Sequence, residues 1–234
     1  MTNLFDGLFL YEVILMLLGS VLFLVVIFLI VKQKDINKNH LMGIGLSILM
    51  IAFPGIKSFS IQDGIINIEK NLEELKENPD DSATKKTLEQ EVGTIGDRPV
   101  KSSRNLTTLS EANLELGKTQ KAETLAKEAL DKAPGNVQAA EVVNVIEVDK
   151  SIEEIKSNPN NKEAKEKLHR KIDKLKKIRT ESGRRTSHIA AGYDALGDEV
   201  MVKAYIDSTR MYQPQHPIIR KYENKEPLVP KSRE

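Results

Sequence analysis

Two stretches of this sequence carry residue types that could do chemistry. The first, Ala112 to Thr119, ends in Gly-Lys-Thr and satisfies the permissive form of a phosphate-binding loop. Such a loop follows a strand and has a flexible backbone, whereas residues 113 to 116 continue a helical pattern. We therefore expect this segment to be the end of a helix and not a nucleotide site.

The second stretch places Ser187, His188 and Asp194 close together in sequence, as a conceivable nucleophile, base and orienting acid. Neighbours on one helix do not easily converge as such a set requires. The chain has no cysteine, which excludes a thiol nucleophile, disulfides and thiolate metal sites. No pair of histidines shows metal-ligand spacing. We expect no catalytic residue, no metal and no cofactor, and hence no enzyme. The four histidines are His40, His169, His188 and His216.

Charge is balanced overall but not locally. With 35 basic and 34 acidic side chains and no tryptophan, the chain offers neither a positive field nor stacking platforms, so we expect no nucleic acid partner. Between Lys162 and Arg185, however, basic side chains exceed acidic ones by seven. This face is either solvated or contacts anionic lipid, at about 1 kcal/mol per basic residue, or an acidic partner. The basic patch comprises Lys167, Arg170, Lys171, Lys174 and Lys177.

The first quarter of the chain is apolar. Residues 13 to 31 contain no charge, and a helix of this length at about 1.5 Å per residue crosses the roughly 30 Å hydrocarbon layer of a bilayer. A cleaved signal peptide is disfavoured because Asp6 and Glu12 precede the run in place of lysines. A second apolar run follows from Leu41. The sequence therefore predicts a membrane anchor over residues 1–61, with helices at about 9–31 and 41–59.

The connector between the two apolar runs holds three lysines, whereas the residues before Glu12 hold none. By the positive-inside rule the connector is cytoplasmic, which predicts a bacterial cytoplasmic (inner) membrane protein whose C-terminal domain lies on the outer side. The charge bias across the second run is small, since Lys57, Lys70 and Lys76 follow it. Pro54 lies within that run, so a re-entrant or interfacial segment is the alternative to a full span.

The rest of the chain repeats itself at a shift of 80 residues. Residues 68–79 overlay 148–159, and each stretch finishes with an Asn-Pro pair. Leu-Gly at 116–117 overlays Leu-Gly at 196–197 at the same shift. We predict a duplicated set of helices over 62–136 and 137–217, followed by a flexible tail over 218–234.

Each copy has the pattern of helices. Leu168, Ile172 and Leu175 recur at three- and four-residue intervals, as an apolar stripe requires. The prolines at 79 and 159 predict helix ends, and the glycines at 117 and 197 predict left-handed caps. Asp63-Gly64 also fits a hairpin turn, but we favour a helix cap at Asp63. The fold class is all-α.

Residues 103–136, taken as a 34-residue unit, resemble a tetratricopeptide repeat. Its signature spacings hold Leu106, Leu109, Gly117, Ala122, Ala129 and Pro134. Residues 183–216 are similar but degenerate, since Val202 and Thr209 replace small alanines. The resemblance implies an α-solenoid of helical hairpins that binds a protein or peptide along a concave face. By the same resemblance, that groove includes Arg104, Thr107, Glu111, Glu115, Arg184, Ser187 and Asp194.

These features together predict a membrane-anchored helical-repeat scaffold for protein–protein interaction in a bacterial envelope complex. Its expected partners are the lipid bilayer and a protein or peptide. The alternative is a membrane effector or channel-like component whose apolar helices oligomerise through Gly43 and Gly45.

Overall fold

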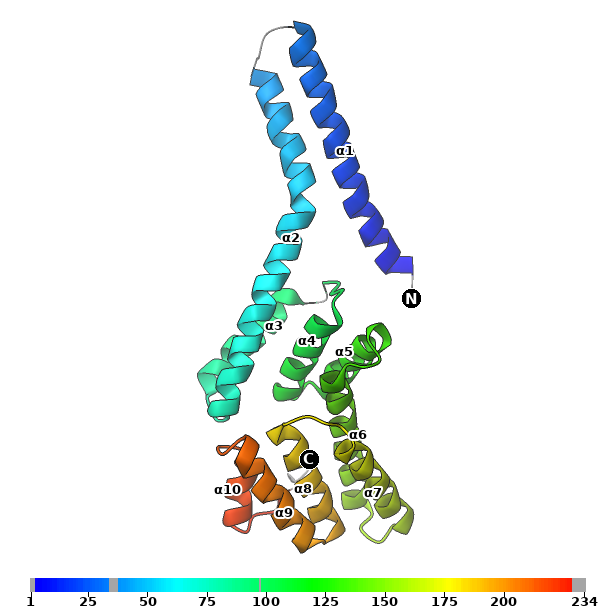
Figure 1. Ribbon diagram of the computed structural model, residues 1–234, viewed down its shortest axis with the longest axis vertical. Coiled ribbons are helices and arrows are strands. Elements are labelled where there is room, and N and C mark those ends of the chain that lie inside the picture. Colours follow the sequence, from blue (N-terminus) through cyan, green and yellow to red (C-terminus); the bar gives the residue numbers. More distant parts are fainter. Residues whose placement is uncertain (1–2, 34–37, 97, 229–234) are drawn as a thin grey trace. The chain divides into compact units, whose positions relative to one another are not determined.

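The computed structural model describes residues 3–33, 38–96 and 98–228, with the side chains of 3–13, 33, 39 and 52–60 left out (Figure 1). Every regular element in those ranges is an α-helix, so the all-α prediction is confirmed there. The chain divides into two compact units, residues 1–64 and residues 65–234.

The first unit contains α1 (Asn3–Gln33) and the first part of α2 (Lys38–Glu77). Small residues let these helices approach closely. A Cβ added to Gly43 would lie 2.7 Å from a methyl carbon of Val26, and one added to Gly19 would lie 3.0 Å from the carbonyl oxygen of Ser47. The Ser47 hydroxyl is buried and donates a hydrogen bond to the carbonyl of Gly43 at 2.9 Å. Gly43 is therefore used inside the hairpin, whereas Gly45 faces open space.

One helical segment of the described residues, Ile14–Lys32, is long and apolar enough to cross a membrane. Only 11% of it is buried by the rest of the chain. In α2 the apolar stretch His40–Ile51 is shorter. The predicted second span over 41–59 ends among residues whose side chains lie outside the described part, although the backbone stays helical there.

The second unit contains the end of α2 and a series of shorter helices. The pairs α4 with α5, α6 with α7 and α8 with α9 each pack as a hairpin, and α6 also contacts α4, α5 and α8. The helices are α3 (Ser82–Ile95), α4 (Ser103–Glu115), α5 (Thr119–Lys132), α6 (Val137–Ser157), α7 (Lys162–Lys176), α8 (Gly183–Leu196), α9 (Glu199–Tyr212) and α10 (Pro217–Glu223).

Helix boundaries in the second unit recur at a shift of 80 residues. The helices α3, α4, α5 and α6 begin at 82, 103, 119 and 137, and α7, α8, α9 and α10 begin at 162, 183, 199 and 217. The side chains of Asp81 and Asn161 cap α3 and α7 by accepting backbone N–H groups. Gly117 and Gly197 have φ of +72° and +77°, which confirms the predicted left-handed glycines.

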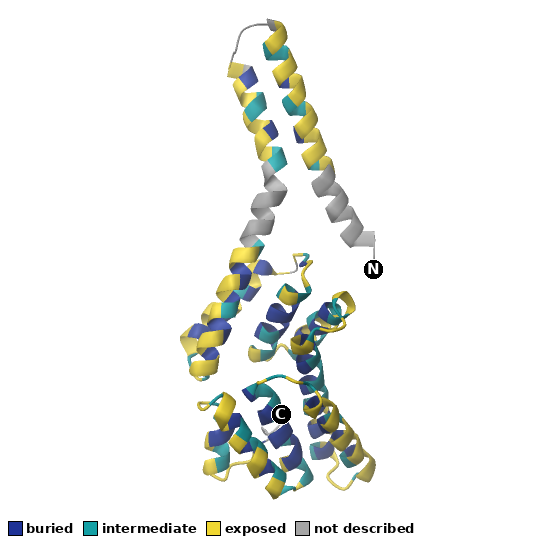
Figure 2. Ribbon diagram, viewed as in Figure 1, coloured by how far each residue is buried: buried dark blue, intermediate teal, exposed yellow. Residues whose placement is uncertain are grey.

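The core lies where these hairpins meet (Figure 2). Its larger cluster includes Leu168, Ile172 and Leu175 of α7, all fully buried, packed against residues of α6, α8 and α9. Burying each such side chain contributes roughly 1.5–3 kcal/mol. The rings of Tyr193 and Tyr205 stack within it, with centroids 5.8 Å apart. A smaller cluster joins the alanines of α5 to Val142 and Ile146 of α6.

Two expectations about element ends were wrong. No cap or hairpin forms at Asp63, because α2 runs through Gly64 to Glu77. A glycine inside a helix costs about 1 kcal/mol, and the buried stripe of Ile65, Ile68 and Leu72 just beyond it offsets that cost. The tail predicted from 218 begins instead with α10, whose Ile218 and Ile219 are buried. Both side chains belong to the same hydrophobic core cluster as residues of α8 and α9. Residues 229–234 of the predicted tail lie outside the described part.

Candidate functional site

A groove of about 850 Å³ runs between the helices of the second unit. We call it the central groove. Its walls combine apolar side chains such as Leu72 and Leu114 with four charged side chains from α4, α6 and α8. These charged residues are Glu111, Glu115, Glu141 and Arg184. Of the predicted partner-binding residues, Glu111, Glu115 and Arg184 line the groove, and Ser187 lines a neighbouring pocket.

Arg184 joins α8 to α4 across the central groove. Its guanidinium lies 3.2 Å from a carboxylate oxygen of Glu111 and 3.5 Å from one of Glu115, and its side chain is only 13% exposed. Burial alone would lower the pKa of Arg184, but the carboxylates of Glu111, Glu115 and Glu141 outweigh it and raise that pKa. The residue is therefore a fixed internal cation and not a solvated one.

Glu141 completes the acidic wall. It is 4% exposed and accepts hydrogen bonds from the hydroxyl of Ser182 at 2.7 Å and from the hydroxyl of Thr180. A buried carboxylate without such donors would be costly. These contacts tie the loop before α8 to α6, so the groove wall is held in one arrangement.

Arg104 and Thr107, the first-copy equivalents of Arg184 and Ser187, do not line the groove. Arg104 is 79% exposed and contacts both carboxylate oxygens of Glu69 at 3.2 Å. The Thr107 hydroxyl donates to the carbonyl of Ser103 and accepts from the Asn136 amide. Arg104 and Arg184 stand at equivalent positions, yet only the side chain of Arg184 is largely shielded from solvent.

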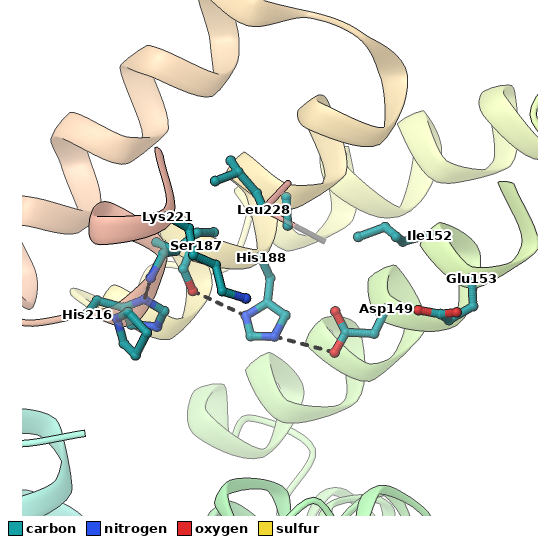
Figure 3. Close-up of a pocket in the computed structure, with 11 residues that line it drawn as sticks. Asp149, Ile152, Glu153, Ser187, His188, His216, Lys221 and Leu228 are labelled. Atoms are coloured by element: carbon teal, nitrogen blue, oxygen red, sulfur yellow. Dashed lines mark hydrogen bonds and ion pairs between the residues drawn. The ribbon is translucent and has the colours of Figure 1, made fainter. Parts of the chain in front are cut away.

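A smaller pocket of about 300 Å³ lies between α6, α8 and α10 (Figure 3). We call it the end pocket. His188 lies at its wall, with Nδ1 2.8 Å from the carbonyl oxygen of Arg184 and Nε2 3.4 Å from a carboxylate oxygen of Asp149. A carbonyl oxygen only accepts, so Nδ1 carries a proton. Burial would lower the pKa of His188, but Asp149 outweighs it and raises that pKa, so the imidazolium is favoured.

This arrangement argues against nucleophilic chemistry at Ser187. Its hydroxyl donates to the carbonyl of Arg184 at 2.8 Å, and the nearest ring nitrogen of His188, 3.4 Å away, already carries a proton. A protonated nitrogen cannot act as the base that the reaction needs. Asp194 lines neither the end pocket nor the central groove. Burial raises the pKa of Asp194, and a hydrogen bond from the backbone of Leu228 opposes the rise.

His216 was not singled out by sequence reasoning, although it stands at the boundary of both cavities. Its Nδ1 accepts the backbone N–H of Ile218 at 3.2 Å and so caps α10. Burial, with the positive charges of His188, Arg184 and Lys221, lowers the pKa of His216 to about 4. The ring is therefore neutral with its proton on Nε2. Its equivalent, Asn136, caps α6 in the same way, and this shared cap is a signal that the sequence contained.

The two ends of the second unit touch beside the central groove. The side chain of Gln213 donates to the carbonyl of Lys76 at 3.1 Å, and Arg220 of α10 pairs with Asp80 in the turn before α3. The Arg220 hydrogen bond is the largest of the causes that lower the pKa of Asp80. Gly183 makes room for Gln213, because a Cβ there would lie 2.5 Å from the Gln213 Cβ. We call these contacts the clasp.

Part of the predicted basic patch is neutralised within the chain. Lys167 pairs with Glu154 at 2.6 Å and Lys171 pairs with Glu147, both on α6. Arg170 lies 3.9 Å from Glu166 on its own helix. Within the described residues only Lys174 and Lys177 of the patch make no ion pair.

The Gly-Lys-Thr segment belongs to a helix-to-helix turn. Residues 112–115 are helical, Lys118 precedes α5, and its ammonium lies 2.9 Å from a carboxylate oxygen of Glu89. Among the described residues no cluster of three histidine or acidic side chains is placed to hold a metal ion. No protein-family model matches this chain, and no curated protein is similar enough to it to count as a relative.

Proposed function

We propose that this protein is a membrane-anchored helical-repeat scaffold that holds a protein or peptide partner in a bacterial envelope complex. The observation that carries the proposal is the central groove, whose volume of about 850 Å³ lies within the range of ligand-binding clefts. Its polar wall is held by internal ion pairs and hydrogen bonds, so it is formed before any partner arrives. A preformed surface lowers the entropic cost of binding.

The repeated helix boundaries support a tetratricopeptide-like solenoid arising from an 80-residue duplication. Stacked hairpins of this kind bury their apolar stripes against neighbours and leave one continuous concave surface. The alanines of α5 at 122, 126 and 129 are fully buried, as close approach of two helices in such a hairpin requires. Partner binding along the concave surface is the use to which such folds are suited.

The anchor is proposed to be the hairpin of α1 and the first part of α2. Segment Ile14–Lys32 leaves large apolar side chains such as Leu17, Leu24 and Phe28 exposed, and a bilayer would cover them. By the positive-inside rule, the three lysines between the two apolar runs support a cytoplasmic connector and a second unit on the outer side. Added protease on intact spheroplasts should then digest the second unit. Digestion only after lysis would overturn this sidedness.

The scaffold function is tested by a matched pair of variants in the full chain. Tyr212 lines the central groove and is 43% exposed, whereas its neighbour Met211 is 80% exposed and lies outside it. Affinity purification from solubilised membranes followed by quantitative mass spectrometry identifies partners. We expect Tyr212→Ala to reduce the bound partner at least about tenfold, as loss of an aromatic contact residue does, and Met211→Ala to leave it unchanged. Equal retention by both variants would contradict docking in the groove.

A further inference from the structure

The shift of 80 residues relates the end pocket to a part of the central groove. Ile152, Ala191 and Lys221 of the end pocket correspond to Leu72, Glu111 and Glu141 of the central groove. The helices α6, α8 and α10 that frame the end pocket correspond to α2, α4 and α6. The same frame therefore occurs twice within the second unit. The two sites differ in what fills them.

In the first copy, the site is occupied by a side chain from the next repeat. Arg184 of α8 reaches back to Glu111 and Glu115 of α4, with Glu141 of α6 near enough to raise its pKa. A cation is thus held by the carboxylates of Glu111 and Glu115, with that of Glu141 nearby. The guanidinium acts as an internal ligand, supplied by the helix that follows in the stack.

In the second copy, two of these three negative charges are absent and the third is reversed. Ala191 and Ala195 replace Glu111 and Glu115, and Lys221 replaces Glu141. No later repeat exists in the described chain to supply an occupant, and the pocket keeps a volume of about 300 Å³. Its walls are mostly apolar, with Ile152, Ile218 and Leu228 buried around it.

Two hydrogen-bond donors at the end pocket are unused by the described residues. The Lys221 ammonium makes no ion pair there, and Nε2 of His216 makes no hydrogen bond. The acidic side chains at the pocket are already engaged, because Asp149 pairs with His188 and Glu153 pairs with Lys156. The charge that remains without a partner at the pocket is therefore the positive charge of Lys221.

We propose that the end pocket binds a glutamate or aspartate side chain, carried by an otherwise apolar segment of a partner protein. The carboxylate accepts hydrogen bonds from Lys221 and His216, and the apolar part of the segment packs on Ile152, Ile218 and Leu228. The partner thus takes the place that Arg184 takes in the first copy, with the opposite charge. This inference rests on the proposed scaffold function and specifies the chemistry of its partner.

The test uses the full chain in detergent and three labelled amphipathic peptides that differ at one position of the apolar face, which is Glu, Gln or Lys. Fluorescence anisotropy gives the affinities. We expect the Glu peptide to bind at least about tenfold more tightly than the Lys peptide, because only it offers a carboxylate to the two donors. Lys221→Glu should reverse that order, since it replaces the cation by the carboxylate that Glu141 supplies at the equivalent position.

Lys203→Glu is the matched control, because it makes the same charge change on the exposed face of α9. The order of the peptides should persist in this variant. An equal reversal would show a net-charge effect and overturn the inference, as would equal affinity of the wild type for all three peptides. In that last case, binding that Tyr212→Ala still weakens would leave the scaffold proposal standing. NMR of the His216 ring adds a second readout, since a bound carboxylate raises its pKa.

Discussion

The two 80-residue copies share the positions of their helices but differ in the side chains that lie between those helices. Their helices begin at equivalent positions, and equivalent glycines adopt left-handed φ after α4 and α8. Inside this frame, the first copy joins Ser103, Thr107 and Asn136 by neutral hydrogen bonds. The second places titratable His188 and His216 at the positions of Thr108 and Asn136. Caps and turns therefore fix where helices lie, whereas the side chains between them decide what each site can hold.

The largest effect is expected at the two equivalent arginines, Arg184 and Arg104. Arg184→Met leaves the groove carboxylates without their cation, and breaking a buried ion pair costs about 3 kcal/mol. Arg104→Met at the equivalent exposed position should cost under about 1 kcal/mol. Urea unfolding of the full chain in mild detergent, followed by tyrosine fluorescence, measures both. Equal losses would remove the distinction between the copies.

The next test is pH. His216 has a folded pKa of about 4, below its ordinary value of 6.5, so its contribution to stability is present above pH 6.5 and is lost as pH falls toward 4. The loss amounts to as much as about 3 kcal/mol at 1.36 kcal/mol per pKa unit. His216→Asn installs the cap residue of the first copy and should flatten the stability profile between pH 6.5 and 4. An unchanged profile would mean that the ring is not buried neutral.

His188 should act in the opposite direction. Its folded pKa is raised, so its contribution is complete below the unfolded value of about 6.5 and is lost as pH rises through the folded pKa. His188→Thr, the residue of the first copy, should abolish that loss. The comparison of unfolding free energies at pH 6 and pH 8.5 for both proteins measures it. A loss that persists in the variant belongs to another group.

A size exchange in the core gives a smaller effect. Gly192 and Ile172 lie next to each other in the second copy. The equivalent residues of the first copy are Ala112 and Val92. A Cβ at Gly192 would lie 2.8 Å from the Cδ1 of Ile172, which is fully buried. We expect Gly192→Ala to destabilise by about 1–2 kcal/mol and Ile172→Val to restore about half of it. Additive effects in the double-mutant cycle would contradict this pairing.

The smallest effect concerns the clasp. Gln213 donates to the carbonyl of Lys76, and the first copy has Ala133 at that position. Gln213→Ala should lower the unfolding free energy by about 0.5–1 kcal/mol, the net value of one hydrogen bond. The same urea titration detects it, with Gln138→Ala as a control in the groove. A loss well above about 1 kcal/mol would contradict the prediction that this variant removes only one hydrogen bond.

The helical frame was predictable because its determinants are local. A proline after an asparagine ends a helix wherever it occurs, and Asp81 and Asn161 cap the next helix by contacts within three residues. The buried fate of Arg184 was not predictable in this way. Arg104 has the same residue type and the same place in its repeat, and only the helix packed opposite distinguishes them. The end pocket did have a signal, namely the exchange of Glu141 for Lys221 between the copies.

The element ends that sequence reasoning missed share a cause. The cap expected at Asp63 was inferred from the helix pattern at the equivalent residues 139–147 and from the capping propensity of aspartate, and the tail expected from 218 was inferred from the propensity of a charged stretch with prolines for disorder. In each case buried side chains overrode that propensity, Ile65 and Ile68 in α2 and Ile218 and Ile219 in α10. Tertiary burial of this kind is invisible until the neighbouring helices are known.

The clasp has a consequence for how the chain is made. It joins residues 140 positions apart, Arg220 and Asp80, so the second unit cannot close until α10 has left the ribosome. The apolar helices α1 and α2 are synthesised before α10, so they are complete while that unit is still incomplete. During most of synthesis the central groove therefore lacks the contacts that Gln213 and Arg220 make with Lys76 and Asp80, and the second unit is completed only when residues 217–228 have been synthesised.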